Sequence, residues 1–97
     1  MQFEIAPKST EILASWYDAK LYCFALNVDG KTGWRLPNKE ELNEIYQSKN
    51  DLEEEWYWSS TEGNGDDAWL QTMSNGYQYY HLKNTGNCYV RAIRDLT

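Results

Sequence analysis

The spacing of hydrophobic residues changes halfway along the chain, and the two spacings predict different elements. In the first half, apolar residues recur every three or four positions, as they do on one face of an α-helix. From Trp56 onwards apolar and polar residues alternate, as in a strand that buries one face. Helices followed by a run of strands are typical of α+β proteins. The pattern therefore predicts an α+β fold: a first strand, two helices and then an antiparallel meander.

The first of the two helices is predicted to begin after Ser15. Its side chain suits the N-cap position, and Asp18 follows three residues later, as in a capping box. The apolar stripe of this helix has four members: Trp16, Ala19, Cys23 and Leu26. The turn-forming residues 27–30 end the helix, and residues 31–37 form a connection to the next element.

The second helix is predicted to begin after Asn38, another N-cap residue. Glu40 and Glu41 follow in the first turn, where the helix dipole favours negative charge. The apolar stripe contains Leu42, Ile45 and Tyr46, and the helix is expected to end near 48–50. The charged run 51–55 (DLEEE) is then expected to form a solvated turn.

Period-two alternation predicts the strands. Their expected ranges are Gln2–Ile5, Trp56–Ser60, Ala68–Met73, Tyr77–Lys83 and Cys88–Arg94. Asn75 and Gly76 are a strong hairpin signal between the third and fourth of these ranges. Alternation also divides the last strand into two faces: Cys88, Val90 and Ala92 against Tyr89, Arg91 and Ile93.

Length and charge limit the possible partners. A chain of 97 residues supports one hydrophobic core, so residues 1–97 are expected to form a single domain. The net charge is −6, without the clustered Lys and Arg that a phosphate backbone requires, which argues against nucleic acid and anionic lipid. No apolar run approaches a membrane span, and the N-terminus lacks the pattern of a signal peptide. We therefore expect a protein that stays in the cytoplasm of a bacterium or its host, is exported by a route that needs no signal peptide, or is part of a virion.

The aromatic content changes this picture, because 15% of the residues are Phe, Trp or Tyr. A strand with one buried face cannot bury all of Tyr77, Tyr79, Tyr80 and His81, and tyrosines at a surface often mark contact sites. The neighbouring loop 61–67 adds polar side chains: Glu62, Asn64 and Asp66. These residues are candidates for binding a protein or a glycan. The alternative is an ordinary half-buried strand with its outer face in water.

Candidate cation and thiol chemistry is sparse. Glu62, Asn64, Asp66 and Asp67 could offer oxygen ligands to calcium, although a plain acidic turn is the preferred interpretation. Cys23 and Cys88 are expected to be reduced and buried, and a single disulfide is the alternative. His81 is the lone histidine, and catalysis is not expected from it. No cofactor is expected.

Several motifs together resemble one domain family. In order they are the W–A–YC–L pattern of the first helix, GWRLP at 33–37, KEEL at 39–42, YWSST at 57–61, AW at 68–69 and VRAIR at 90–94. This set resembles the bacterial and phage family typified by the C-terminal domain of collagen-like adhesins. That family is related to C-type-lectin-like folds and to formylglycine-generating enzymes.

The resemblance implies a C-type-lectin-like fold, in which two helices pack on a twisted antiparallel sheet and the N- and C-terminal strands are adjacent. Motif residues are then expected to be structural: Trp34, Arg35, Trp58, Trp69 and Arg91. The three tryptophans would lie in the core, and the two arginines would pair with carboxylates. The calcium motifs of lectins and the paired cysteines of formylglycine-generating enzymes are both missing from this sequence, so neither activity is carried over.

Together these observations favour a non-enzymatic binding module, such as a phage or bacterial accessory protein, which contacts a protein or a glycan through loops and the Tyr-rich strand. Two alternatives stay open. One is a structural subunit that self-associates, and the other is an enzyme of the formylglycine-generating type.

Overall fold

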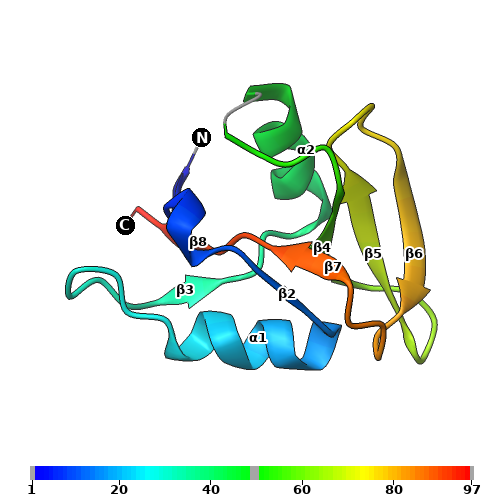
Figure 1. The fold of residues 1–97 in the computed structure, drawn as a ribbon, viewed down its shortest axis with the longest axis horizontal. Helices are drawn as coiled ribbons and strands as arrows, with labels where there is room; N and C mark the ends of the chain where they lie inside the picture. The colour runs from blue at the N-terminus through cyan, green and yellow to red at the C-terminus, as the bar shows by residue number, and fades with distance from the viewer. Residues whose placement is uncertain (1, 49–50, 97) are drawn as a thin grey trace.

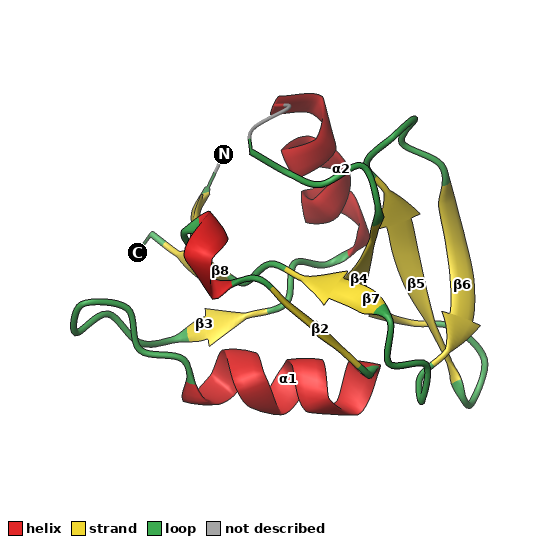
Figure 2. Ribbon diagram, viewed as in Figure 1, coloured by secondary structure: helices red, strands yellow, loops and turns green. Residues whose placement is uncertain are grey.

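The computed structural model describes residues 2–48 and 51–96, which form two α-helices, a short 3-10 helix and two β-sheets (Figures 1 and 2). In chain order the elements are β1 (Phe3–Ile5), the 3-10 helix (Lys8–Thr10), β2 (Ile12–Ala14), α1 (Trp16–Ala25), β3 (Trp34–Arg35), α2 (Lys39–Ser48), β4 (Trp56–Glu62), β5 (Asp67–Thr72), β6 (Gln78–Leu82), β7 (Cys88–Val90) and β8 (Ile93–Asp95). The predicted α+β class is confirmed.

Both helices begin at the predicted caps. The Ser15 hydroxyl accepts a hydrogen bond from the Asp18 N–H at 3.2 Å. Asn38 and Glu41 form a reciprocal capping box, in which each side-chain oxygen accepts from the backbone N–H of the other at 2.8 Å. Leu42 is buried on α2, as the apolar stripe predicted. Local side-chain chemistry therefore fixes where each helix starts.

The strands form a five-stranded sheet in the order β2-β7-β4-β5-β6 and a three-stranded sheet in the order β1-β8-β3. The predicted pairing of the chain ends is confirmed, because Phe3 lies opposite Asp95 and Ile5 opposite Ile93. The predicted purely antiparallel meander is wrong at one place. β7 passes β5 and β6 and pairs parallel to β4, with Tyr89 opposite Tyr57. The segment 83–87 crosses the sheet to reach that position.

Three strands differ from the prediction. β2 and β3 were not expected, since two or three residues are too few to show an alternating pattern. The last predicted strand is divided into β7 and β8 at Arg91 and Ala92, where the Ala92 carbonyl accepts from the Ala6 N–H at 2.9 Å. Each of these differences depends on pairing with residues far away in the chain.

The two helices cover opposite faces of the five-stranded sheet. Trp58 packs with Trp16 and other residues of α1 in the larger core cluster, whereas Tyr57 packs with Leu42 and Ile45 of α2 in the smaller one. Tyr57 and Trp58 are consecutive in β4, so their side chains point to opposite faces. Figure 1 shows α1 and α2 on opposite sides of this strand. The predicted two faces of the last strand also agree, because Cys88, Val90 and Ala92 join the larger cluster, and Tyr89 and Ile93 pack in the smaller.

Buried indole groups fasten the larger cluster to the backbone. The Trp16 Nε1–H donates to the Ser59 carbonyl and the Trp58 Nε1–H to the Ala14 carbonyl, both at 2.9 Å. Trp34 is also buried, and its Nε1–H donates to the Lys31 carbonyl at 2.9 Å. A buried indole needs such a partner because it would otherwise lose a hydrogen bond to water. Trp16 and Trp58 therefore fix the positions of α1 and β2 relative to β4, whereas the Trp34 bond is local to the segment that leads into β3.

Candidate functional site

Five aromatic side chains form a connected row of ring contacts at one edge of the five-stranded sheet. We call this row the aromatic strip; in order it contains Trp56, Tyr77, Tyr79, Tyr80 and Trp69. The centroids of neighbouring rings are 6.4, 6.0, 4.7 and 5.5 Å apart. These distances lie in the range of about 4.5–7 Å at which aromatic rings attract each other. The strip is therefore one continuous surface.

The strip follows β6, the terminal strand of its sheet (Figure 1). Tyr77, Tyr79 and Tyr80 expose 58%, 48% and 45% of their surface. Consecutive residues of a strand point to opposite faces, yet the rings of Tyr79 and Tyr80 stack at 4.7 Å. This contact is possible because β6 has no strand on its outer side, so a ring can lean around the edge. The strip therefore presents ring surface at the edge itself.

A cavity of about 370 Å³ lies beside the strip. Its lining residues are Glu55, Trp56, Leu70, Tyr79, His81, Asn87 and Cys88. Pockets that bind small molecules are generally apolar with a few polar groups, and this lining has that character. His81, predicted from sequence as a binding candidate, is thus placed next to Tyr79. Glu55, Asn87 and Trp56 were not predicted, because only the fold brings three other segments to β6.

The opposite end of the strip is anchored to α2. Trp69 was expected in the core, but it is only partly buried, and the Lys39 ammonium lies 3.6 Å from the centroid of its ring. The side-chain amide of Gln78 donates through Nε2 to the Lys39 carbonyl at 2.9 Å. Trp69 lies outside the core because Ala68 and Leu70, its neighbours on β5, take the inward positions. Trp69 therefore contributes to the strip.

The predicted loop 61–67 is held in place by a lysine. The Lys83 ammonium donates to Glu62 Oε1 at 2.7 Å and to the Gly65 carbonyl at 2.9 Å. It also lies 4.5 Å from the centroid of the Trp16 ring. The pKa of Glu62 is lowered by this hydrogen bond to Lys83. The Glu62 carboxylate therefore already has a positive partner.

The structure does not assemble the candidate calcium ligands into a metal site. Among residues 2–48 and 51–96, no three His, Cys, Asp or Glu side chains converge in a way that could hold an ion. The Asn64 carbonyl accepts from the Asp67 N–H at 3.2 Å, and the Asp66 carbonyl accepts from the Lys83 N–H at 2.7 Å. These backbone contacts shape the loop as a tight turn beside the end of β6.

Both cysteines are free thiols buried in the larger core cluster. Burial raises the pKa of Cys23 to about 12 and that of Cys88 to about 11. Reactive cysteines have a lowered pKa, because the thiolate is the nucleophile. His81 and Cys88 line the same cavity, but they belong to β6 and β7, which β4 and β5 separate. The thiols therefore have the environment of packing residues.

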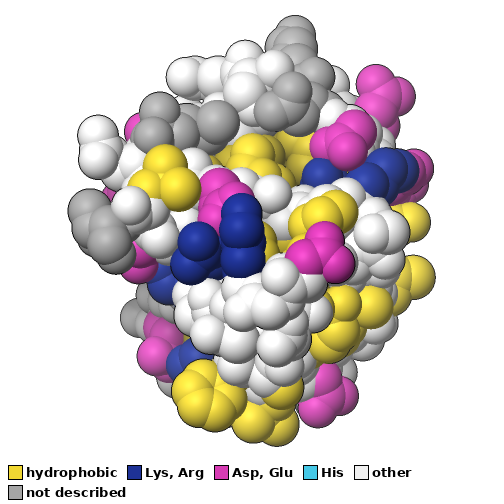
Figure 3. All heavy atoms as spheres, turned by 90° about the vertical axis from the view of Figure 1, so that its left-hand side faces the viewer, with side chains coloured by type: hydrophobic (Ala, Val, Ile, Leu, Met, Phe, Trp, Pro, Cys, Tyr) yellow, Lys and Arg dark blue, Asp and Glu magenta, His cyan; other side chains and the backbone are white. Residues whose placement is uncertain are grey.

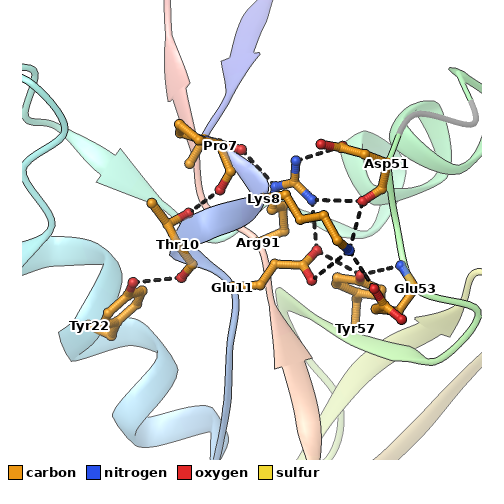
Figure 4. Close-up of polar contacts among 10 residues, drawn as sticks. Pro7, Lys8, Thr10, Glu11, Tyr22, Asp51, Glu53, Tyr57 and Arg91 are labelled. Atoms are coloured by element: carbon orange, nitrogen blue, oxygen red, sulfur yellow. Dashed lines mark hydrogen bonds and ion pairs between the residues drawn. The ribbon is translucent and has the colours of Figure 1, made fainter.

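Arg91 lies at the centre of a polar cluster, on the other side of the molecule from β6 (Figures 1 and 4). Its guanidinium donates to the Ala6 carbonyl, to Glu11 Oε2 and to Asp51 Oδ1, each at 2.7 Å. Tyr57 joins the cluster by donating its hydroxyl to Glu11 Oε2 at 2.7 Å. Every guanidinium nitrogen thus has a protein partner, and the cluster fastens the segments 6–11 and 51–53 to the end of β7. The segment 51–55 was predicted to be a solvated turn, but it is solvated only in part, because Asp51 and the backbone of Glu53 take part in this cluster.

Arg35 connects α2 with the C-terminal strand. Its two terminal nitrogens donate to the two carboxylate oxygens of Glu41, both at 2.8 Å, and Nη2 also donates to Asp95 Oδ1 at 2.8 Å. Glu41 is the same residue that caps α2. The hydrogen bonds from Arg35 hold the pKa of Glu41 below its ordinary value. Arg35 of the GWRLP segment therefore links α2 to β8.

A second exposed apolar surface lies on α1. Tyr17, Leu21 and Phe24 share its outer face at helical spacing and expose 50%, 68% and 84% of their surface. Hydrophobic side chains gather at the lower edge of Figure 3, the side on which α1 lies in Figure 1. The sequence carried a signal for this surface, because these three apolar residues fall outside the predicted buried stripe. Neither helix in residues 2–48 and 51–96 is long and apolar enough to cross a membrane.

Comparison with known proteins places the chain in a family. A search among curated proteins finds no significant match. The family model described as "Lcl C-terminal domain" matches residues 4–94, which include both helices, every residue of the aromatic strip and all strand residues except Phe3 and Asp95. Because the match extends over nearly the whole sequence, the chain belongs to the Lcl C-terminal domain family.

Proposed function

We propose that this chain is a non-enzymatic binding module that holds its ligand on the aromatic strip. The observation that carries the proposal is the row of three half-exposed tyrosines along the edge strand: Tyr77, which directly precedes β6, and Tyr79 and Tyr80 within it. Large rings in mutual contact form an exposed apolar surface, and such surfaces commonly mark binding sites. Their contacts with one another also limit the rotamer freedom that would be lost when a ligand binds.

The chemistry of the strip suits a protein or a glycan. Tyrosine combines a large ring with a hydroxyl, and it is enriched among the residues that dominate protein interfaces. Sugar rings can stack on the same surfaces, and the adjoining cavity offers polar groups from Glu55, His81 and Asn87. The net charge of −6 favours a neutral or basic ligand over a nucleic acid.

Two arguments support a binding role over catalysis. The raised pKa values of Cys23 and Cys88 keep both thiols protonated near neutral pH, which suits packing better than nucleophilic attack. The cluster around Arg91 satisfies its own charges internally. An enzyme of the formylglycine-generating type would need a reactive thiol, so this alternative has less support.

We further propose that the fold is of the C-type-lectin-like type and that the chain is related to the C-terminal domains of collagen-like adhesins, among bacterial and phage proteins. The paired terminal strands β1 and β8 and the two helices beside the five-stranded sheet support this relation. The family match over residues 4–94 is consistent with it. Calcium is not part of the proposal.

The test replaces the tyrosines of the strip. The Tyr79→Ala/Tyr80→Ala variant and the wild-type protein are compared on a glycan array and in capture from bacterial lysate, with and without calcium. Capture should be lost in the variant while the thermal unfolding temperature stays near that of the wild type, since both side chains are half exposed. Tyr17→Ala, which removes an equally exposed tyrosine from α1, is the matched control and should retain capture. Equal capture by all three proteins would contradict the proposal.

The outer face of α1 favours a second candidate, a structural subunit that self-associates. Tyr17, Leu21 and Phe24 would be covered if two copies met along this face. The measurement is the mass in solution by light scattering over a range of concentrations. Self-association should disappear in Phe24→Asp, whereas Tyr79→Ala should not alter it. A wild-type protein that stays monomeric at the highest concentration removes this candidate.

A further inference from the structure

The backbone of β6 has a free hydrogen-bonding edge. The Thr72 N–H donates to the Tyr77 carbonyl at 3.0 Å, and the Lys83 N–H donates to the Asp66 carbonyl at 2.7 Å. In an antiparallel pair, alternate residues direct both backbone groups toward the partner strand. Residues 77, 79, 81 and 83 therefore face β5, and the backbone groups of Gln78, Tyr80 and Leu82 point outward.

Most of these outward groups have no partner in the molecule. Within residues 2–48 and 51–96, the Leu82 carbonyl accepts from the Thr85 N–H at 3.1 Å. The other five groups, both of Gln78, both of Tyr80 and the Leu82 N–H, have no hydrogen bond to the described protein. They are spaced two residues apart along one side of a straight strand. This is the arrangement that an incoming strand requires.

The backbone of β6 lacks the usual protections of an edge strand, whereas the stacked rings of Tyr79 and Tyr80 lean around the edge and must turn toward the faces of the sheet when a strand is added. Edge strands are usually protected by proline, by lysine, by a bulge or by being very short. The sequence of β6 is QYYHL, which contains neither proline nor lysine, and its register with β5 runs without a bulge from Gln78 to Leu82. The opposite edge strand of the same sheet, β2, has only three residues. The five-stranded sheet thus has one edge with five free outward backbone groups on Gln78, Tyr80 and Leu82.

The charges near β6 decide what kind of strand fits. Asp67 lies opposite Leu82 at one end of β6, with Asp66 beside it, and Glu55 lines the cavity next to Tyr79 toward the other end. None of the three belongs to an ion pair among the described residues. The nearby Lys83 is already paired with Glu62. Acidic side chains therefore lie toward both ends of the edge, and the Lys39 ammonium between them is engaged with the ring of Trp69.

The same charges disfavour a second copy of this chain. Two β6 strands related by a twofold axis would pair antiparallel, with Tyr80 opposite its counterpart. The end with Asp66 and Asp67 in one copy would then meet the Glu55 end of the other. Like charges brought together at an interface cost free energy, and each copy also carries a net charge of −6. A basic partner would neutralise these carboxylates instead.

We propose that β6 binds an extended peptide segment of another protein as an additional strand, and that this segment carries lysine or arginine near its ends. The inference rests on the proposed binding function and names the partner. Hydrogen bonds to Gln78, Tyr80 and Leu82 hold the backbone of the peptide. Its side chains alternate between the two faces of the sheet, where they meet the rings of the aromatic strip.

The experiment is selection of binders from a library of short random peptides, with the intact chain as the target. Selected peptides should alternate apolar with polar residues, carry Lys or Arg near the ends and lack proline, and their affinity should fall as salt is raised. Leu82→Pro removes one outward N–H and keeps the β5 ladder, since proline is tolerated on the open side of an edge strand. It should weaken binding about tenfold, and Leu82→Ala, which keeps the N–H, is the matched control.

Hydrogen exchange provides a second measurement that does not depend on a substitution. On addition of a selected peptide, the amides of Tyr80 and Leu82 should become protected, while those of Tyr79 and His81 are protected before and after. Binding that leaves Tyr80 and Leu82 unprotected, or that survives Leu82→Pro at full strength, overturns the strand addition. Selection of acidic or proline-rich peptides, or of none, overturns it as well. If Tyr79→Ala/Tyr80→Ala still abolishes capture of another ligand, the proposed binding function stands without the strand addition.

Discussion

Arg91 and Glu11 form an ion pair that is almost completely shielded from water. Arg91 Nη1 lies 2.7 Å from Glu11 Oε2, and the two side chains expose only 4% and 6% of their surface. Removing one member of a buried pair leaves an uncompensated charge, which typically costs about 3–5 kcal/mol. We therefore expect Glu11→Ala to lower the free energy of unfolding by about 3 kcal/mol, measured by urea denaturation.

Lys8 provides the control for this prediction. It also pairs with Glu11, at 3.7 Å, but its side chain is 43% exposed, so Lys8→Ala should lower the free energy of unfolding much less than Glu11→Ala does. A double variant, Glu11→Leu/Arg91→Met, should recover much of the loss because it removes both charges together. If Glu11→Ala costs no more than Lys8→Ala, the pair does not carry the energy assigned to it.

The bidentate contact between Arg35 and Glu41 predicts sensitivity to acid. The hydrogen bonds from Arg35 lower the pKa of Glu41, so the folded state holds the ionised form more strongly than the unfolded state does. This stabilisation is present above the ordinary pKa of 4.5 and is lost as the pH falls through the lowered value. Glu41→Gln should therefore destabilise the protein at pH 7 by about 1 kcal/mol and have a smaller effect at low pH. Thermal unfolding between pH 7 and pH 2 measures this, and an equal effect at both ends would contradict it.

The buried thiols predict that the protein loses stability at alkaline pH. Burial raises the pKa of Cys23 from 9.0 to about 12, so the unfolded state loses this proton first as the pH rises. The stabilisation is complete below pH 9 and is lost as the pH rises toward 12, by up to about 1.4 kcal/mol per pH unit. Cys23→Ala should show a shallower decline between pH 9 and 11, whatever its stability at pH 7. A decline as steep as that of the wild type would show that Cys23 does not contribute.

Gly76 predicts a steric effect in the turn between β5 and β6. Its φ is +83°, and a Cβ placed there would lie 2.5 Å from Cε2 of Tyr46, which packs against the smaller core. We expect Gly76→Ala to cost about 2–3 kcal/mol, because it combines backbone strain with displacement of that ring. Gly30 has a similar φ of +88° with nothing within 4 Å, so Gly30→Ala should cost only about 1 kcal/mol. Equal losses for the two variants in chemical denaturation would exclude the steric contribution.

Part of the fold could be predicted because its causes are local. Ser15 and Asn38 cap the helices through residues three positions away, and Asn75-Gly76 lies at the end of the turn between β5 and β6, where Gly76 adopts a positive φ. Such signals are visible in any window of a few residues. β2 and β3 could not be predicted, because their pairing with β7 and β8 depends on segments more than fifty residues away.

Part of the candidate site could also be predicted, because its signal is local in the sequence. The tyrosines of β6 were expected at the surface from alternation alone, and they are half exposed. Trp69 was assigned to the core because it falls in a motif of the family that the sequence resembles, but its outward position on β5 follows from the register of that strand. The cavity beside Tyr79 combines four separate segments of the chain, and no local pattern connects them.

The sequence by itself determined the α+β class, the helix starts, the terminal pairing expected from the family resemblance and the presence of surplus aromatic rings. Local hydrogen bonds and side-chain periodicity are sufficient for the elements, since they act over a few residues. Only the tertiary structure decided that β7 crosses to β4 and that β6 is left at the edge. Strand order depends on which distant segments exclude water together, and this is a property of the whole chain. That choice exposes the backbone of Gln78, Tyr80 and Leu82, on which the proposed strand addition depends.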